Sequence, residues 1–267
     1  MTLMNNVNTD VGKVRAISLA APAYNESASI TRVVQSWVDF FLAYDHLQEF
    51  EIVVCNDGSK DETGQLLDEL AKKYPQVRPV HHKINVGAAA ALTTAIENTR
   101  YQWVLLTDSD GQYGIDTTPR LVEALEKTGD RGVIGVRVKK HDSQFARFGS
   151  WASGSLCNLF HNTQYRDFNC ALKLVDGDLL RRINLEARGL NYSAEITSKL
   201  AECGIELAEV EVVHQPRIAG RSSAQNMRAA WHRLLFVSYM GLRQYLLGQK
   251  VIQNRAASSN LTKIERV

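Results

Sequence analysis

Apolar runs of strand length alternate with segments of helical spacing along the first half of the chain. The strand-like runs are "VRAISLAAP", "FEIVVCN", "VRPVHH" and "QWVLLT", and each ends in polar or turn-forming residues. Between the first two runs, apolar residues recur at intervals of three and four, which is typical of a helix with one buried face: Ile30, Val33, Val34, Trp37, Val38 and Phe41. Three further helices are predicted at "GQLLDELAKKY", "NVGAAAALTTAIENTR" and "GIDTTPRLVEALEK". This alternation predicts an α/β fold with a mostly parallel sheet flanked by helices.

The second half of the chain mixes strands and helices less regularly. Strands are predicted at "RGVIGVRV", "CALKLV" and "IELAEVEVVHQ", and helices at "SQFARFGSWASGSLCNLF" and "SAEITSKLAECG". A long amphipathic helix follows in "AQNMRAAWHRLLFVSYMGLRQYLLGQK". No internal repeat or low-complexity linker interrupts the chain, so we expect one domain over residues 15–228. A mobile leader over 1–14 precedes it, and the C-terminal helix and a polar tail over 229–267 follow it.

Composition and charge narrow the class of protein only a little. A chain of 267 residues with a net charge of +2 gives no reason to expect a nucleic-acid partner. The four cysteines are widely spaced and form no CxxC pair, which argues against a zinc site or a disulfide framework and favours a reducing cytoplasm. The start of the chain lacks the apolar core of a signal peptide.

Acidic and polar residues follow three of the predicted strands. They lie in "AYNES", in "NDGSKD" and in "DSDGQ", which holds Asp108, Asp110 and Gln112. Parallel strands place their carboxyl ends at one edge of the sheet, where ligands of α/β proteins bind. Two carboxylates one residue apart suit Mg²⁺ or Mn²⁺, which prefer hard oxygen ligands and can bridge phosphate groups. The alternative is that these aspartates serve only as turn and N-cap residues.

Several motifs, in order, resemble those of a known enzyme family. "APAYNESASI", "IVVCNDGSKDET", "HHKINVGAAAAL" and "LLTDSDGQY" resemble the motifs of inverting GT-A glycosyltransferases of glycosyltransferase family 2. "VIGVRVKKHD", "RDFNCALKLV", "AEITSKLAECG" and "EVVHQPRIAGRSS" are similar to its dolichol-phosphate mannosyltransferase-like branch. Members of this branch transfer a sugar to a polyprenyl phosphate. The resemblance covers about residues 15–225 and implies the GT-A fold.

The resemblance also implies roles for individual residues. Nucleotide-sugar binding is expected of Pro22, Tyr24, Glu26, Asp57 and Asp108. Asp108, Asp110 and Gln112 would hold Mg²⁺ or Mn²⁺ and the donor diphosphate. Catalytic roles are expected of Asp110, Arg137 and Arg217, the two arginines facing phosphate groups. The acceptor phosphate would meet Arg147, Ser150 and Ser222, and Glu195 would support the site.

The expected acceptor follows from a missing motif. Relatives that use sugar acceptors carry an acidic E-D base followed by Q-x-x-R-W, and this chain has neither. A sugar hydroxyl needs a general base, whereas a phosphate monoester is already anionic. We therefore expect a metal-dependent inverting transfer from GDP-mannose or a UDP-hexose to a polyprenyl phosphate. The alternatives are a soluble saccharide or metabolite acceptor, and a non-catalytic paralogue that binds nucleotide sugars.

The route to a lipid acceptor depends on the C-terminal helix. Its longest uncharged run, residues 234–242, is too short to span a bilayer. Basic residues interleave with its apolar ones, which fits a helix lying at a membrane interface, and packing or dimerisation fits equally well. We expect a cytoplasmic protein attached peripherally to the membrane surface or to a membrane partner protein. Whether it forms a homo-oligomer stays open.

Overall fold

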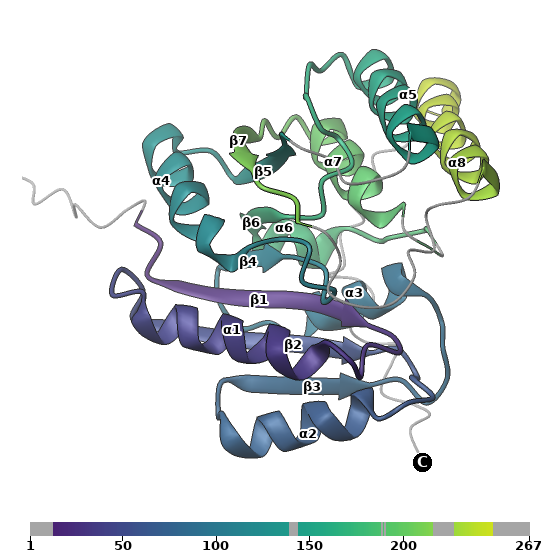
Figure 1. The fold of residues 1–267 in the computed structure, drawn as a ribbon. Coiled ribbons are helices and arrows are strands. Elements are labelled where there is room, and N and C mark those ends of the chain that lie inside the picture. The colour runs from purple at the N-terminus through teal and green to yellow at the C-terminus, as the bar shows by residue number, and fades with distance from the viewer. Residues whose placement is uncertain (1–12, 139–143, 188, 190, 216–226, 248–267) are drawn as a thin grey trace, which may run out of the picture.

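The computed structural model describes residues 13–138, 144–187, 189, 191–215 and 227–247. Seven strands within these residues form one sheet in the order β3-β2-β1-β4-β6-β5-β7 (Figure 1). They are β1 (Ala16–Ala23), β2 (Glu49–Asn56), β3 (Val77–His81), β4 (Trp103–Leu106), β5 (Gly132–Arg137), β6 (Lys173–Asp176) and β7 (Ala208–Val212). All neighbouring pairs are parallel except β6 with β4 and β6 with β5. The predicted α/β fold with a mostly parallel sheet is confirmed.

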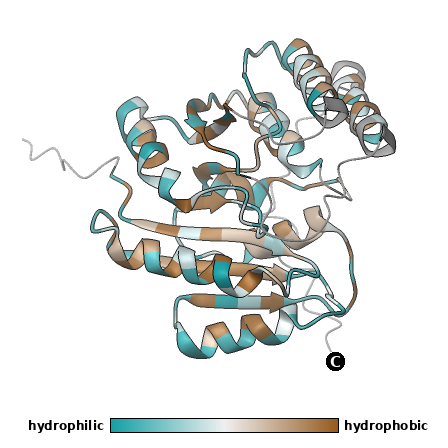
Figure 2. Cartoon of the chain, in the orientation of Figure 1, coloured by the Kyte–Doolittle hydropathy of each residue, from teal (hydrophilic) through white to brown (hydrophobic). Residues whose placement is uncertain are grey.

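Helices cover the sheet of the first half as the apolar spacing predicts. They are α1 (Ile30–Ala43), α2 (Thr63–Lys73), α3 (Ala88–Glu97), the short 3-10 helix η1 (Ile115–Thr117) and α4 (Thr118–Thr128). All six apolar residues predicted for the inner face of α1 are buried. Figure 2 shows hydrophobic colour along the strands and alternating colour around α1 and α2, as expected for helices with one face on the core.

The second half adds four helices to the described chain, and the sequence predicted three of them. They are α5 (Gln144–His161), α6 (Gly177–Arg182), α7 (Tyr192–Glu202) and α8 (Met227–Leu247). The short helix α6 was not predicted. It is capped by Asp176, whose side chain accepts hydrogen bonds from the backbone N–H groups of Asp178 and Leu179. Its six residues are too few for a periodic pattern to be recognised.

Strand register brings the expected polar clusters to one edge of the sheet. β1 lies between β2 and β4 and is parallel to both, so the three strands end at the same edge. Tyr24, Asp57 and Asp108 follow β1, β2 and β4 within two residues. The convergence predicted from the sequence is therefore present.

Helices α5 and α8 lie side by side at one end of the molecule, away from β1 to β3 (Figure 1). Val237 of α8 is buried in a small apolar cluster with Cys157, Phe168 and Ala194. One face of α8 thus packs as a core helix does. Its other face exposes large apolar side chains, as does that of α5: Phe148, Trp151, Leu159, Trp231, Leu235, Tyr239 and Leu242. We call these seven residues the α5–α8 surface.

None of the helices that the structure describes combines the length and the apolar character needed to cross a bilayer. Most of the predicted leader over 1–14 and the tail beyond residue 247 lie outside the described residues. The division of the chain at residue 228 stays a prediction.

Candidate active site

The loop after β4 is held against the neighbouring strand ends. The Ser109 hydroxyl, at the centre of "DSD", donates a hydrogen bond of 2.7 Å to the backbone oxygen of Pro22 at the end of β1. Asp110 is buried, and its Oδ1 accepts a hydrogen bond of 3.0 Å from the backbone N–H of Gln112. Gly111 between them adopts a φ of 74°, a left-handed conformation that glycine reaches without steric cost. The turn therefore fixes both aspartates relative to β1.

Asp108 is half-buried and has a partner from far along the chain. The hydroxyl of Tyr192, the first residue of α7, donates a hydrogen bond to Oδ1 of Asp108. Tyr192 was not among the site residues predicted from the sequence. Nothing in "NYSAEIT" signals this contact, because it depends on how α7 packs against the sheet.

The loops after β1 and β2 support each other. The backbone N–H of Glu26 donates to Thr63 Oγ1 at 2.9 Å, and the Glu26 carboxylate accepts from the Ser29 hydroxyl at 3.0 Å. The side chain of Tyr24 is 41% exposed, so its ring is accessible at the edge of the sheet. This accessibility suits the nucleotide-binding role expected of Tyr24, which stays a prediction.

Asp57 is buried and braces the loop that precedes α3. Its carboxylate accepts hydrogen bonds from the backbone N–H groups of Val86 and Gly87, at 3.0 and 2.8 Å, and lies 2.8 Å from Nδ1 of His82. Three partners hold this carboxylate in one orientation. The direct contact with a base or ribose expected from the sequence stays a prediction, and the observed role of Asp57 is to shape the loop.

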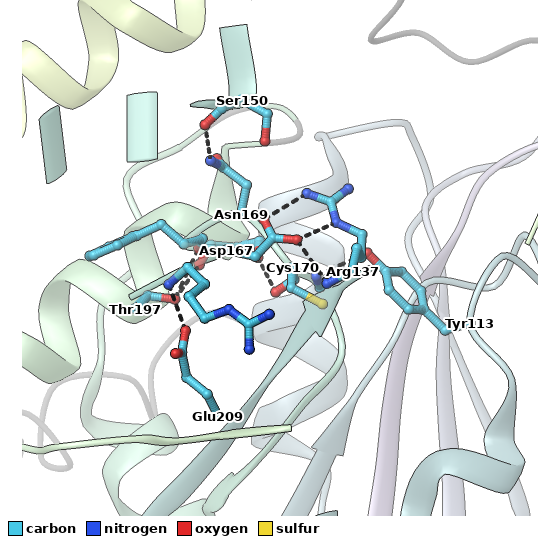
Figure 3. Close-up of polar contacts among 12 residues, drawn as sticks. Tyr113, Arg137, Ser150, Asp167, Asn169, Cys170, Thr197 and Glu209 are labelled. Carbon is cyan, nitrogen blue, oxygen red and sulfur yellow. Dashed lines mark hydrogen bonds and ion pairs between the residues drawn. The ribbon is translucent and has the colours of Figure 1, made fainter. Parts of the chain in front are cut away.

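Arg137 at the end of β5 forms a two-point ion pair with Asp167. The two guanidinium nitrogens Nε and Nη2 lie 2.7 and 3.0 Å from the carboxylate oxygens. Both side chains are nearly inaccessible, with exposures of 10% and 2%. Figure 3 shows the pair facing each other, with Tyr113 and Cys170 beside the guanidinium. Two parallel hydrogen bonds to one carboxylate fix the plane of the Arg137 guanidinium.

Ser150 and Arg147 both lie on α5. The backbone oxygen of Ser150 accepts a hydrogen bond of 3.0 Å from Asn169 Nδ2 (Figure 3). The Ser150 hydroxyl is buried and has no hydrogen-bond partner among the described residues. An unpaired buried hydroxyl is costly, so it is a candidate ligand contact. Arg147 is exposed.

Two predicted site residues, Arg217 and Ser222, lie in residues 216–226, outside the described residues. Gln215, the residue just before this segment, lies against the "DSD" loop. Its backbone N–H donates to the backbone oxygen of Gln112 at 2.8 Å, and its own backbone oxygen accepts from Gln112 Nε2 at 3.3 Å. The roles of Arg217 and Ser222 stay predictions.

Glu195 and His214 are both buried and contact other parts of the protein. Both oxygens of Glu195 accept backbone N–H bonds, from Glu186 at 2.7 Å and Ala187 at 2.9 Å, and Lys199 pairs with it at 2.7 Å. His214 is buried and packs edge to face on Tyr113.

Lys173 is a buried cation that the sequence analysis did not single out. It begins β6 opposite Leu106 of β4, two residues before Asp108, and is fully buried. Its ammonium donates to the backbone oxygen of Cys170 and, at 2.6 Å, to the Ser193 hydroxyl. Burial lowers the pKa of Lys173 to about 8. A lone lysine inside the apolar run "CALKLV" was the available signal.

A divalent cation fits the donor set of the "DSD" loop. Two carboxylates and the amide of Gln112 are hard oxygen donors, the type Mg²⁺ and Mn²⁺ prefer. In the part of the chain that the structure describes, no group of three or more acidic, histidine or cysteine side chains is gathered as a complete metal site. Magnesium sites are often built from one or two protein carboxylates that share the ion with substrate phosphates.

With this geometry in view, comparison with known proteins identifies the family. Residues 18–185 match the model of glycosyl transferase family 2, and the chain belongs to that family. The resemblance inferred from the motifs is confirmed. The expected class of enzyme, a glycosyltransferase, is supported by the same match.

Two curated relatives illustrate the branch. The chain is 27% identical over 208 residues to dolichyl-phosphate beta-glucosyltransferase ALG5A of Trichomonas vaginalis, covering 73% of this chain and 64% of the relative. It is also 27% identical over 175 residues to dodecaprenyl-phosphate galacturonate synthase of Rhizobium johnstonii, covering 63% and 50%. The match thus spans less than two thirds of the length of either relative.

A solved structure shows the same fold. Glucosyl-3-phosphoglycerate synthase of Mycobacterium tuberculosis, in complex with Mn²⁺, UDP-glucose and glycerol 3-phosphate, superposes with a TM-score of 0.65 at 20% identity. The superposition covers 85% of this chain and 80% of the synthase chain. The expected GT-A type of fold is confirmed by this likeness.

Proposed function

We propose that this protein transfers a sugar from a nucleotide-sugar donor, GDP-mannose or a UDP-hexose, to a polyprenyl phosphate, with inversion at the anomeric carbon. The observation that carries the proposal is the pairing of two sites at one sheet edge. The "DSD" loop offers carboxylates on one side. On the other lie the fixed guanidinium of Arg137 and the buried hydroxyl of Ser150, which has no hydrogen-bond partner within the described chain.

Asp108, Asp110 and Gln112 would hold Mg²⁺ or Mn²⁺ on the donor side. A cation bound there would offset the negative charge of the departing diphosphate. The buried position of Asp110 and its bond to the backbone of Gln112 favour one fixed geometry, which lowers the cost of organising the site. Tyr24 and Asp57 would line the nucleotide pocket nearby, the latter through the loop it braces.

The acceptor side would bind a phosphate group. A guanidinium suits phosphate oxygens, and Asp167, which is bonded to Nε and Nη2 of Arg137, sets the plane of this one. The Ser150 hydroxyl and Arg147, with Arg217 and Ser222 from outside the described residues, would complete the contacts. An acceptor phosphate oxygen would attack the anomeric carbon as the bond to the diphosphate breaks, and the nucleoside diphosphate would leave with the bonding electrons.

An anionic acceptor removes the need for a base. Asp167 is paired with Arg137, and Glu195 is bonded to two backbone N–H groups and Lys199. Neither is arranged to take a proton from a sugar hydroxyl. This supports a phosphate acceptor over a saccharide. The names of the two curated relatives, one dolichyl-phosphate and one dodecaprenyl-phosphate enzyme, point the same way.

We further propose that the α5–α8 surface meets the membrane in which such an acceptor resides. Tryptophan and tyrosine favour the boundary between lipid and water, and this surface carries Trp151, Trp231 and Tyr239, each more than half exposed. Such contact would give a peripheral protein at the cytoplasmic membrane face. A membrane partner protein is the alternative occupant.

The test is a transfer assay with paired variants. Purified protein with Mg²⁺ or Mn²⁺ meets radiolabelled GDP-mannose, UDP-glucose, UDP-galactose or UDP-N-acetylglucosamine, each with and without a polyprenyl phosphate. We expect label to enter the organic phase with one donor, and Asp110→Asn to reduce this about 10³-fold because the diphosphate charge is no longer offset. Asp116→Asn, on the exposed turn six residues later, should behave as wild type.

Other outcomes would redirect the proposal. Donor hydrolysis, or labelling of a soluble saccharide without lipid labelling, would replace the polyprenyl acceptor with a soluble one. Nucleotide-sugar binding with no turnover under any condition would favour a non-catalytic paralogue. Full activity of Asp110→Asn would remove the metal assignment.

A further inference from the structure

The first turn of α7 reaches the acidic loop from the opposite half of the sheet. Tyr192 is 4% exposed, and its hydroxyl donates to Oδ1 of Asp108. A phenol hydroxyl donates hydrogen bonds, and a carboxylate oxygen accepts them.

Buried hydrogen bonds fix this turn of α7 in place. The hydroxyl of the next residue, Ser193, donates a hydrogen bond of 2.6 Å to the backbone oxygen of Cys170. It also accepts a hydrogen bond of 2.6 Å from the Lys173 ammonium. One turn later, the Thr197 hydroxyl donates to the backbone oxygen of Phe168 at 3.2 Å. Since β6 and the segment before it hold the helix start, the Tyr192 hydroxyl has little freedom to move.

We propose that Tyr192 is a positioning residue that holds the Asp108 carboxylate in the orientation needed to bind the divalent cation. This inference rests on the proposed metal-dependent function. A carboxylate at the end of a strand can rotate about two side-chain bonds, and a fixed donor to one oxygen directs the other toward the ion. Loss of such outer partners typically weakens metal binding about 10–100-fold.

The test compares two tyrosines that each lose one hydroxyl. Tyr192→Phe removes the hydroxyl that donates to Asp108. Tyr165→Phe removes a hydroxyl that accepts a hydrogen bond of 3.0 Å from the backbone N–H of Leu207. Mn²⁺ binding is measured by electron paramagnetic resonance of free Mn²⁺, with saturating UDP or GDP. We expect Tyr192→Phe to bind Mn²⁺ about tenfold more weakly than wild type, and Tyr165→Phe to match wild type.

Two further readouts separate positioning from loss of structure. Thermal midpoints in EDTA should fall by similar amounts in both variants, because each loses one buried hydrogen bond. In the transfer assay, excess Mn²⁺ should restore most of the rate of Tyr192→Phe, which a damaged fold would not allow.

The outcomes are distinguishable. Unchanged Mn²⁺ affinity in Tyr192→Phe, with wild type binding normally, overturns the role of Tyr192 and leaves the proposed function intact. An equal loss of affinity in both variants also overturns it. Wild-type protein that binds no Mn²⁺ with either nucleotide overturns the metal-dependent function itself.

Discussion

The helices of the first half and the α5–α8 pair both carry apolar residues at helical spacing, but they place them differently. In α1 the six apolar residues of the inner face are buried, and one large apolar residue at its end, Leu42, is exposed. In α5 and α8 only some apolar positions pack, such as Val237 and Met240. The seven residues of the α5–α8 surface stay in contact with water. The same sequence pattern therefore serves a core in one region and a surface in the other.

Buried carboxylates are balanced in both regions by backbone N–H groups and by cationic side chains. In the first half, Asp57 is balanced mainly by backbone N–H groups and one histidine. Glu51, also in the first half and buried, pairs with Arg78. In the second half Arg137 pairs with Asp167, and Glu195 combines an ion pair to Lys199 with two backbone N–H bonds.

The largest effect is expected from breaking the buried ion pair of the second half. Asp167→Ala removes the two-point partner of Arg137 and leaves a guanidinium that is only 10% exposed without it. Removing one partner of a buried pair typically costs about 3–5 kcal/mol of folding free energy. Urea denaturation followed by circular dichroism measures the loss.

A surface pair of the same region is the control. Glu211→Ala removes the partner of Arg166, where both side chains are about half exposed and the charged atoms are 2.7 Å apart. The expected loss is much smaller, since water screens such pairs. Similar losses for the two variants would mean that the Arg137–Asp167 pair is not a significant stabilising contact.

The next effect concerns the exposed aromatic residues. Trp151→Ser and Trp231→Ser should each weaken sedimentation with vesicles containing anionic lipid by about tenfold, because each removes a ring that inserts at the lipid boundary. Leu42→Ser on α1 is the control, as Leu42 is exposed to a similar degree, 59% against 65% and 62%. If Leu42→Ser lowers binding as much, the two regions do not differ as surfaces.

The sequence predicted the first half better than the second for a physical reason. Its strands and helices follow one another along the chain, so local periodicity and strand order suffice to bring Asp57 and Asp108 to one edge. The second half depends on contacts between distant segments. Tyr192 meets Asp108 across 84 positions, and β6 runs antiparallel between β4 and β5. No local pattern encodes these pairings, although the lone Lys173 in an apolar run could have prompted a search.

The smallest effect comes from a carboxylate that the second half buries without a direct partner. Both oxygens of Glu202, the last residue of α7, are buried with no hydrogen bond within the described chain, although Arg243 and Lys199 lie near enough to influence it. Burial raises the pKa of Glu202 from 4.5 to about 7. The folded state therefore binds a proton more tightly than the unfolded state, and this group's contribution to stability is lost as pH rises from about 4.5 to 7.

Glu202→Gln removes this charge and should be more stable than wild type at pH 8, by about 1 kcal/mol after allowance for partial solvent access, with no gain at pH 4.5. Urea denaturation at both pH values measures the difference, and Glu206→Gln, at an exposed position just beyond α7, is the matched control. Equal changes at the two pH values would show that the effect comes from packing. A loss at pH 8 would show that Arg243 and Lys199 outweigh burial, and the buried acids of the second half would then be as well balanced as Asp57 is in the first.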